Sequence, residues 1–92
     1  MKKRIDHWID GDTGIFTDGR IFRLAGVRAP EHHQFGGETA TRRVAGMTGQ
    51  SNGLVNVRRV GGSYGRDVVE LRNGDGSING RMRSRGYTHS GR

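Results

Sequence analysis

The segment GIFTDGRIFRLAGVRAP, residues 14–30, decides the fold that we expect. Its apolar runs flank the Asp18-Gly19 pair, which is typical of a tight β-hairpin turn, and they predict strands over 14–16 and 20–27. Pro30 has no amide hydrogen to donate to a neighbouring strand, so it ends the second strand. Residues 14–27 are therefore expected to form an antiparallel pair of strands.

Further strands are expected on both sides of this hairpin. Ile5 and Ile9 belong to an alternating run that predicts a strand over residues 4–9. Apolar residues also predict strands over 54–60 and 67–71, joined through a glycine-rich loop. The sequence thus provides five short strands.

Two short helices complete the expected set of elements. Apolar residues at helical spacing predict a helix over 38–47. Ser77 suits a helix N-cap and Gly86 a C-terminal stop, so a second helix is expected between them. This order predicts an α+β fold, a five-stranded OB-type β-barrel with two short packed helices, although composition alone does not separate it from another small α+β fold. The residues expected in its core are Ile5, Ile9, Phe16, Phe22, Leu24, Val57 and Val69.

Length and composition restrict the class of protein. The 92 residues form one domain, 1–92, in which 1–3 and 88–92 are expected to be flexible. The chain has no cysteine, which excludes disulfides and thiolate metal sites. It has no apolar run of membrane-spanning length and no signal peptide, so as it stands we expect a cytoplasmic protein, or a secreted one if a signal peptide has been removed.

The charge of the chain points to a polyanionic partner. The formal net charge is +7 and the isoelectric point is about 11.3. Phosphate backbones attract such a surface, because binding releases their counterions, and this favours DNA or RNA as the partner. The alternative is that the charge only keeps a small domain soluble.

Three clusters contain residues of the types that take part in catalysis or ligand binding. Asp10-Gly11-Asp12-Thr13 forms an acidic turn between two predicted strands. Arg23 lies within an apolar strand, where an arginine needs a partner or a ligand, and Glu31 directly follows the proline that ends this strand. Tyr64-Gly65-Arg66 presents an aromatic ring and a guanidinium on a glycine-rich loop. Each cluster alone also fits a purely structural role, and Arg23 with Glu31 could form a simple surface ion pair.

These clusters resemble the staphylococcal-nuclease (thermonuclease) family in their order and spacing. The resemblance continues with Asp75-Gly76-Ser77-Ile78-Asn79 and Gly86. The resemblance covers residues 5–87, almost the whole chain. It implies a five-stranded OB barrel with packed helices. It also implies a nuclease that hydrolyses the phosphodiester bonds of DNA or RNA, usually with calcium.

The resemblance implies a role for each matching residue. Arg23 and Arg66 match catalytic arginines, whose guanidinium forks suit the charged oxygens of a phosphorane transition state. Glu31 matches a catalytic glutamate that orients water or takes its proton. Tyr64 matches a tyrosine that lines the nucleotide site.

The same resemblance implies a metal site with one altered ligand. Asp12 matches a direct metal ligand, Asp10 lies beside it as a supporting residue, and the backbone carbonyl of Ala29 falls where the family uses a carbonyl ligand. Arg28 stands where active members carry a second aspartate ligand. We expect Arg28 to form an ion pair with Asp12, so that calcium or another divalent cation binds weakly or not at all and activity is low, metal-independent or shifted to another ion. The alternative is that Arg28 swings out along its flexible side chain and leaves a weaker metal site intact.

Further expectations follow from the rest of the chain. The family normally continues into a last helix beyond Gly86, and we therefore expect the uncovered surface to favour a homodimer. His32-His33 suggests zinc, but no well-spaced third ligand follows, so solvent-facing histidines are favoured. The main alternative function is a catalytically impaired OB-fold module that binds single-stranded nucleic acid, and a weaker one is a module that binds another acidic partner.

Overall fold

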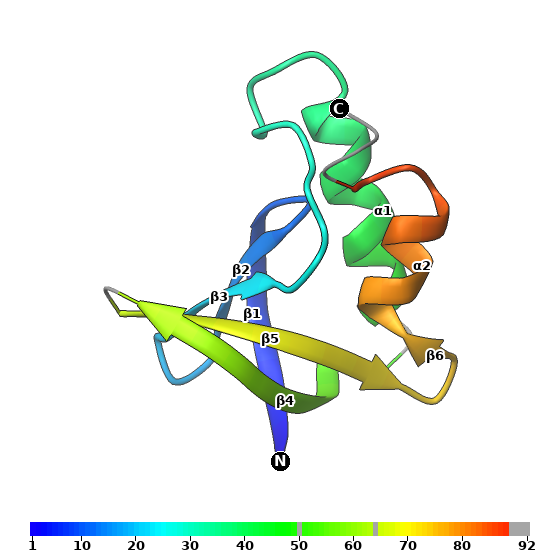
Figure 1. The fold of residues 1–92 in the computed structure, drawn as a ribbon. Coiled ribbons are helices and arrows are strands. Elements are labelled where there is room, and N and C mark those ends of the chain that lie inside the picture. Colours follow the sequence, from blue (N-terminus) through cyan, green and yellow to red (C-terminus); the bar gives the residue numbers. More distant parts are fainter. Residues whose placement is uncertain (50, 64, 89–92) are drawn as a thin grey trace.

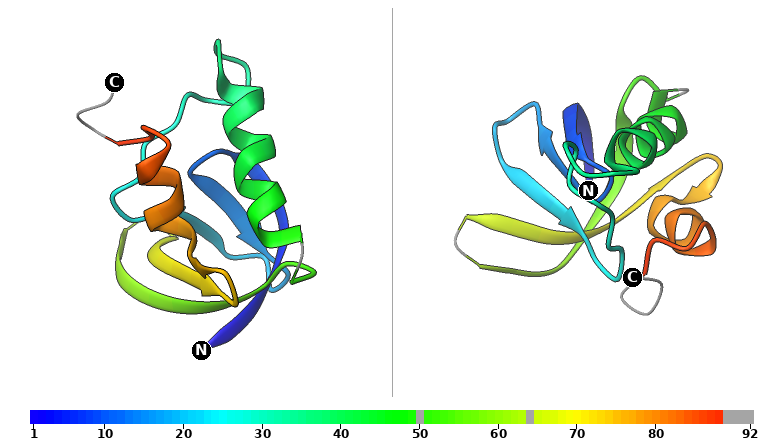
Figure 2. Two further views of the ribbon diagram at one scale, coloured as in Figure 1. Left: turned by 90° about the vertical axis from the view of Figure 1, so that its right-hand side faces the viewer. Right: turned by 90° about the horizontal axis from the view of Figure 1, so that it is seen from above.

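The fold is described from a computed structural model, which describes residues 1–49, 51–63 and 65–88. Figure 1 shows a curved sheet with the two helices lying on one side of it, and the views in Figure 2 agree. The class is α+β, as predicted. The elements are, in chain order, β1 (Lys2–Asp10), β2 (Thr13–Phe16), β3 (Ile21–Leu24), α1 (Gly37–Gly49), β4 (Leu54–Ser63), β5 (Arg66–Asn73), β6 (Gly76–Ser77) and α2 (Ile78–Ser84).

The strands form one sheet in which five strands close into a ring of hydrogen bonds. The order is β3-β2-β1-β4-β5-β6, and its neighbours pair antiparallel. β3 also pairs with β5 in parallel, from Ile21 opposite Arg66 to Leu24 opposite Val69, and this pairing closes the ring. The two-residue strand β6 extends the sheet beyond β5 and was not predicted. Closure leaves the five ring strands without a free long edge.

The β2–β3 hairpin forms at the predicted Asp18-Gly19 turn. Gly19 has a φ of 88°, a conformation that favours glycine, and the Arg20 amide donates to the Asp18 carboxylate at 3.0 Å. β3 ends at Leu24 instead of the predicted Val27, because Gly26, with a φ of 69°, turns the chain away from the sheet. This turn begins the segment that leads to α1.

β1 contains two register shifts against β2, one between Ile5 and His7 and one between Trp8 and Asp10. Each shift changes the face of the sheet to which the following side chains point. Trp8 therefore packs against the core, with its ring 5.1 Å from that of Phe22 in a T-shaped contact. Ile9 is 40% exposed, so its prediction as a core residue was wrong.

The core lies between the inner face of the ring and the two helices. Five of the seven predicted core residues, Ile5, Phe16, Phe22, Leu24 and Val69, are buried, and Val57 packs against them from a half-buried position. The buried core cluster also contains Val27, Val44, Val55, Leu71, Ile78 and Met82. The 13-residue helix α1 extends the predicted helix at both ends. Neither described helix is long and apolar enough to cross a membrane.

α2 begins and ends at the predicted residues. The Ser77 hydroxyl accepts a hydrogen bond from the Gly80 amide at 2.9 Å, which satisfies one of the free amides of the first turn. Gly86 follows the last helical turn with a φ of 94°. The sequence signals at Ser77 and Gly86 are therefore confirmed.

A buried asparagine fixes α2 to the sheet. The Asn79 side chain is fully buried; its oxygen accepts from the Leu71 amide at 2.9 Å. Its Nδ2 donates to the carbonyls of Ala25 at 2.9 Å and Val69 at 3.0 Å. One side chain thus joins the first turn of α2 to β5 and to the segment that follows β3.

Candidate functional site

A pocket of about 560 Å³ lies where the outer face of β2 and β3 meets the turn after β1 and the loop before α1. We call it the candidate site. It is lined by Ile9, Asp10, Asp12, Thr13, Ile21, Arg23, Arg28, Ala29, Glu31, Gln34 and Arg66. All of the site residues proposed from the sequence that the structure describes therefore line one pocket; Tyr64 lies outside the described residues.

Strand register brings the two candidate catalytic arginines together. Ile21 lies opposite Arg66 and Arg23 lies opposite Val68 in the parallel β3–β5 pairing. Residues opposite each other point to the same face, and Phe22 and Leu24 occupy the inner face. Arg23 and Arg66 are thus diagonal neighbours on the outer face.

The acidic turn is held by a network of backbone and side-chain hydrogen bonds. Asp12 is buried; its Oδ1 accepts from the Thr13 hydroxyl at 2.9 Å and its Oδ2 from the Ala29 amide at 3.2 Å. The Asp12 carbonyl accepts from the Leu24 amide at 2.8 Å. These bonds tie the turn after β1 to β3 and to the segment before Pro30.

The turn is also packed closely beneath α1. A Cβ atom on Gly11 would lie 2.7 Å from the Cβ atoms of both Ala29 and Ala40. Only glycine fits this position without movement of its neighbours. The spacing Asp-Gly-Asp therefore has a packing reason as well as a chemical one.

Two carboxyl groups of this turn are electrostatically linked. Partial burial, followed by the hydrogen bond and the negative charge of Asp12, raises the pKa of Asp10 to about 6. The Asp12 amide donates to Asp10 Oδ1 at 3.2 Å. The acidic side of the pocket therefore takes up a proton more readily than two independent aspartates would.

Glu31 lies on an exposed loop at the rim of the candidate site. Its amide donates to the Gln34 side chain at 2.9 Å, and its carbonyl accepts from the Gln34 amide at 2.9 Å. A Cβ on Gly37 would lie 1.8 Å from the Glu31 carbonyl oxygen, so this tight turn requires glycine. The Glu31 carboxylate is 65% exposed and lies 3.4 Å from His33 Nε2.

The expected ion pair between Arg28 and Asp12 does not form. Both Asp12 carboxylate oxygens already accept hydrogen bonds, from Thr13 and Ala29, and the exposed Arg28 side chain makes no hydrogen bond or ion pair within the described residues. That part of the prediction was wrong: the Asp12 carboxylate accepts from local donors of the turn, and the Arg28 side chain is exposed.

The pocket holds three guanidiniums that lack an acidic partner. Among the residues that the structure describes, Arg23, Arg28 and Arg66 form no ion pair. Their hydrogen-bond donors remain available to a ligand, and a guanidinium fork fits phosphate oxygens in bidentate fashion. Electrostatically the pocket suits an anion on its arginine side and a water or cation on its aspartate side.

The aspartate side of the pocket offers two carboxylates, those of Asp10 and Asp12, to a cation. Calcium takes six to eight oxygen ligands. Each Asp12 oxygen accepts one hydrogen bond, and Arg28 brings a positive charge into the same pocket, which disfavours a cation there. Within the described ranges no three or more His, Cys, Asp or Glu residues form a group that could hold a metal ion.

The sequence patterns did not indicate every residue of this pocket. Gln34 was missed, although a polar side chain in a glycine-rich loop beside Glu31 is a signal for it. The aromatic residue Phe35 follows Gln34 and is a second signal in the same loop; its ring is fully exposed.

Comparison with known proteins finds no family model that matches this chain and no curated protein similar to it.

Proposed function

We propose that this protein is a nuclease that hydrolyses phosphodiester bonds of DNA or RNA. The observation that carries the proposal is one pocket lined by two unpaired arginines of adjacent strands and by a carboxylate of the facing loop. These are the groups that phosphoryl transfer to water needs: cations for the phosphorane oxygens and a base for the water. The positive net charge favours a polyanionic substrate.

The fold supports the same proposal. A closed ring of five strands, with a helix between the third and fourth, agrees with the small OB-type barrel of the staphylococcal-nuclease family. We infer that the ring is such a barrel and that the sequence resemblance reflects this family.

In the proposed reaction Glu31 acts as general base. Its carboxylate takes a proton from a water molecule whose oxygen attacks phosphorus, and the opposite phosphorus–oxygen ester bond breaks. The leaving oxygen takes a proton from solvent. Arg23 and Arg66 hold the two non-bridging oxygens, where negative charge increases in the transition state. No step of this reaction requires a metal ion.

The test is hydrolysis of labelled single-stranded DNA and RNA by the purified protein, with calcium or with chelator. Glu31→Gln keeps the size of the side chain but removes its basicity, and it should lower the rate about a hundred- to a thousandfold. Arg72→Ala, an exposed arginine of β5 outside the candidate site, is the control and should retain the rate. Equal, mild effects of both substitutions would overturn the proposed role of Glu31.

One observation favours a second function, a non-catalytic module that binds single-stranded nucleic acid. Glu31 is exposed, and within the described residues its carboxylate pairs with His33 instead of with an arginine of the pocket. Phe35, in the same loop, offers an exposed ring for stacking on a base. A binding module would shift the mobility of an oligonucleotide without producing fragments.

A further inference from the structure

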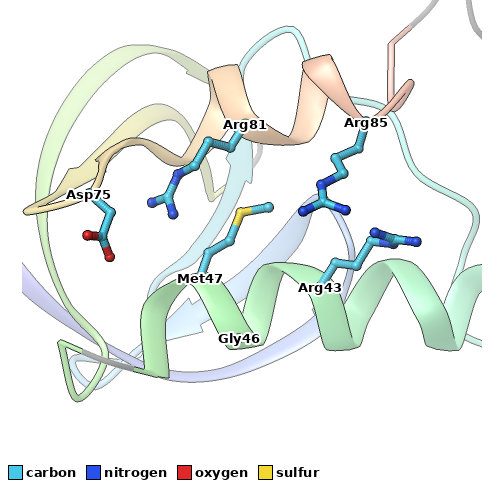
Figure 3. Close-up of a pocket in the computed structure, with 6 residues that line it drawn as sticks. All are labelled: Arg43, Gly46, Met47, Asp75, Arg81 and Arg85. Atoms are coloured by element: carbon cyan, nitrogen blue, oxygen red, sulfur yellow. The ribbon is translucent and has the colours of Figure 1, made fainter.

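A second basic pocket, of about 250 Å³, lies between the two helices. We call it the interhelix cleft. Figure 3 shows the side chains of Arg81 from α2, of Arg85 directly after α2 and of Arg43 from α1 extending into the space between the helices. The cleft is lined by Arg43, Gly46, Met47, Asp75, Arg81 and Arg85.

The cleft concentrates like charges. Arg81 lies in α2 and Arg85 is the C-cap residue that follows the helix, four residues later, and like charges at this spacing repel. Arg43 faces them from α1, and Asp75 is the single carboxylate in the lining. Within the described residues none of the three guanidiniums forms an ion pair. Three cations against one carboxylate leave an excess of positive charge.

One of these arginines is fixed while the other two keep their donors free. Arg81 donates from Nε to the Ser77 carbonyl at 3.3 Å and from Nη2 to Asn73 Oδ1 at 2.9 Å. No hydrogen bond is made by the Arg43 or Arg85 side chain within the part of the chain that the structure describes. The cleft therefore has one oriented guanidinium and two that can close on a ligand.

The neighbouring arginine of α1 behaves differently. Arg42 forms an ion pair with Glu38 one turn earlier, although both side chains are exposed. Arg43 has no such partner and enters the cleft. The absence of an acidic partner is thus specific to the cleft side of α1. A Cβ on Gly46 would meet no atom within 4 Å, so open space lies beside this position of the lining.

We propose that the interhelix cleft binds a phosphate group of a nucleic-acid strand, outside the candidate site. Guanidinium forks at a concave site are suited to phosphate oxygens. A backbone contact links the two sites: the Arg28 amide donates to the Tyr87 carbonyl at 3.0 Å, two residues after Arg85. The wall of the candidate site therefore adjoins the end of α2 from which Arg85 extends. The choice of nucleic acid rests on the proposed function, whereas the anion site itself does not.

The first experiment follows backbone amides by NMR while inorganic pyrophosphate is added to the full chain. The amides of Gly46 and Met47 should shift and saturate in the unmodified protein. They should not do so in the double variant Arg43→Gln/Arg85→Gln. Arg42→Gln/Arg83→Gln is the control, because it removes the same charge from the same helices but does not touch the cleft. Circular dichroism checks that both variants fold.

The second experiment measures binding of a single-stranded oligonucleotide of about ten nucleotides. Loss of two guanidinium contacts to the phosphate should weaken binding about tenfold at 0.15 M salt. It should also lower the slope of log K against log salt, because neutralising a phosphate releases its counterions. The control variant should do neither. Hydrolysis of a dinucleotide, too short to reach the cleft, should be equal in both variants.

The outcomes separate the two proposals. If pyrophosphate shifts no cleft amide, or both variants respond alike, the phosphate site is overturned. If pyrophosphate binds but the oligonucleotide affinity of the cleft variant is unchanged, the cleft is a site for a free anion and the nucleic-acid assignment is overturned. If cleft binding persists while no substrate is hydrolysed, the proposed function alone fails.

Discussion

Two groups of arginines in the same sheet region make opposite use of their charge: Arg20 and Arg59, and Arg23 and Arg66. Arg20 and Arg59 close on Asp67: Arg20 donates to its two carboxylate oxygens at 2.8 Å each, and Arg59 Nε donates to Oδ1 at 3.1 Å. Arg66, the residue before Asp67, enters the candidate site with Arg23, and neither forms an ion pair within the described residues. Because successive residues of a strand face opposite ways, Arg66 and Asp67 belong to different environments.

The difference separates arginines that stabilise the fold from arginines that are available to a ligand. Net charge alone does not distinguish the two groups. The Arg20 guanidinium first, and Arg59 after it, hold the pKa of the Asp67 carboxyl well below its usual range, so this carboxylate is ionised and its partners are engaged. The arginines of the candidate site keep their forks free, and free forks in a pocket are what a phosphate ligand requires.

The largest expected effect contrasts one arginine from each group. Arg66→Ala should lower the rate of hydrolysis about a hundred- to a thousandfold and leave thermal unfolding almost unchanged, because it removes a transition-state donor from an exposed position. Arg59→Ala should do the reverse, lowering the unfolding midpoint while the rate is retained. Rates on labelled oligonucleotides and thermal unfolding by circular dichroism measure both. Similar profiles for the two variants would remove the distinction.

The second prediction concerns Arg28, one of the unpaired arginines of the candidate site, and reverses its charge. Arg28→Asp removes a cation from the pocket and adds an oxygen ligand, so calcium should bind at least about tenfold more tightly, since like charges near 4 Å repel by about 4 kcal/mol at an effective dielectric of 20. Calorimetry measures the affinity. Arg72→Asp, an exposed charge reversal on β5 outside the candidate site, is the control. Tight calcium binding by the unmodified protein, with hydrolysis abolished by chelator, would show that Arg28 does not weaken the site.

The third prediction concerns the rim of the candidate site. Phe35→Ala should weaken binding of single-stranded DNA about tenfold, because stacking of one base on an aromatic ring contributes about 1–3 kcal/mol. Phe35→Tyr should keep the affinity. Val60→Ala, which shortens another exposed apolar side chain, serves as control. Fluorescence anisotropy of a labelled oligonucleotide gives the affinities, and an unchanged value for Phe35→Ala contradicts a stacking role.

The smallest expected effect concerns Asp67 and its paired arginines, and is the pH dependence of protein stability. A carboxylate with a lowered folded pKa stabilises the protein above its unfolded pKa of about 3.9, and this contribution is lost as the pH falls below that value through the folded pKa. Asp67→Asn should therefore be less stable than the unmodified protein at pH 7, and the difference should shrink on acidification below about pH 4. Urea unfolding across this range measures it. A difference that stays constant would show that the ion pairs do not carry it.

Local sequence patterns predicted most elements of the fold but not their irregularities. The Asp18-Gly19 turn and the Ser77 cap are decided within a few residues, so the sequence alone predicted them. The exposure of Ile9 depends on register shifts in β1, which alternation of apolar residues does not reveal. The parallel β3–β5 pairing that closes the ring joins distant segments, and periodicity contains no information on it.

The candidate site shows the same division. Motif order predicted that Asp12, Arg23 and Glu31 belong together, and they line one pocket. The partner of Asp12 was predicted wrongly, because charge suggested Arg28 whereas backbone geometry supplied the Ala29 amide. Which charged groups pair thus depends on the backbone geometry of the turns that position them. Residue types alone do not indicate this geometry.

The hydrogen bonds around Asn79 also affect which asparagines of the protein deamidate. Asparagine followed by glycine deamidates when the next backbone nitrogen attacks the side-chain carbonyl carbon, and the chain contains this pair at Asn52-Gly53, Asn73-Gly74 and Asn79-Gly80. The half-buried Asn73 side chain donates to the Met47 carbonyl at 2.8 Å and accepts from the Asp75 amide at 3.0 Å, so it is also held. At Asn79 the amide is fixed by three hydrogen bonds, and the Gly80 nitrogen is held by the Ser77 hydroxyl. Asn52 is exposed, in a turn with a φ of 56°. Isoaspartate should therefore accumulate at Asn52 in stored native protein, whereas its formation at Asn79 would record a molecule in which α2 had unfolded.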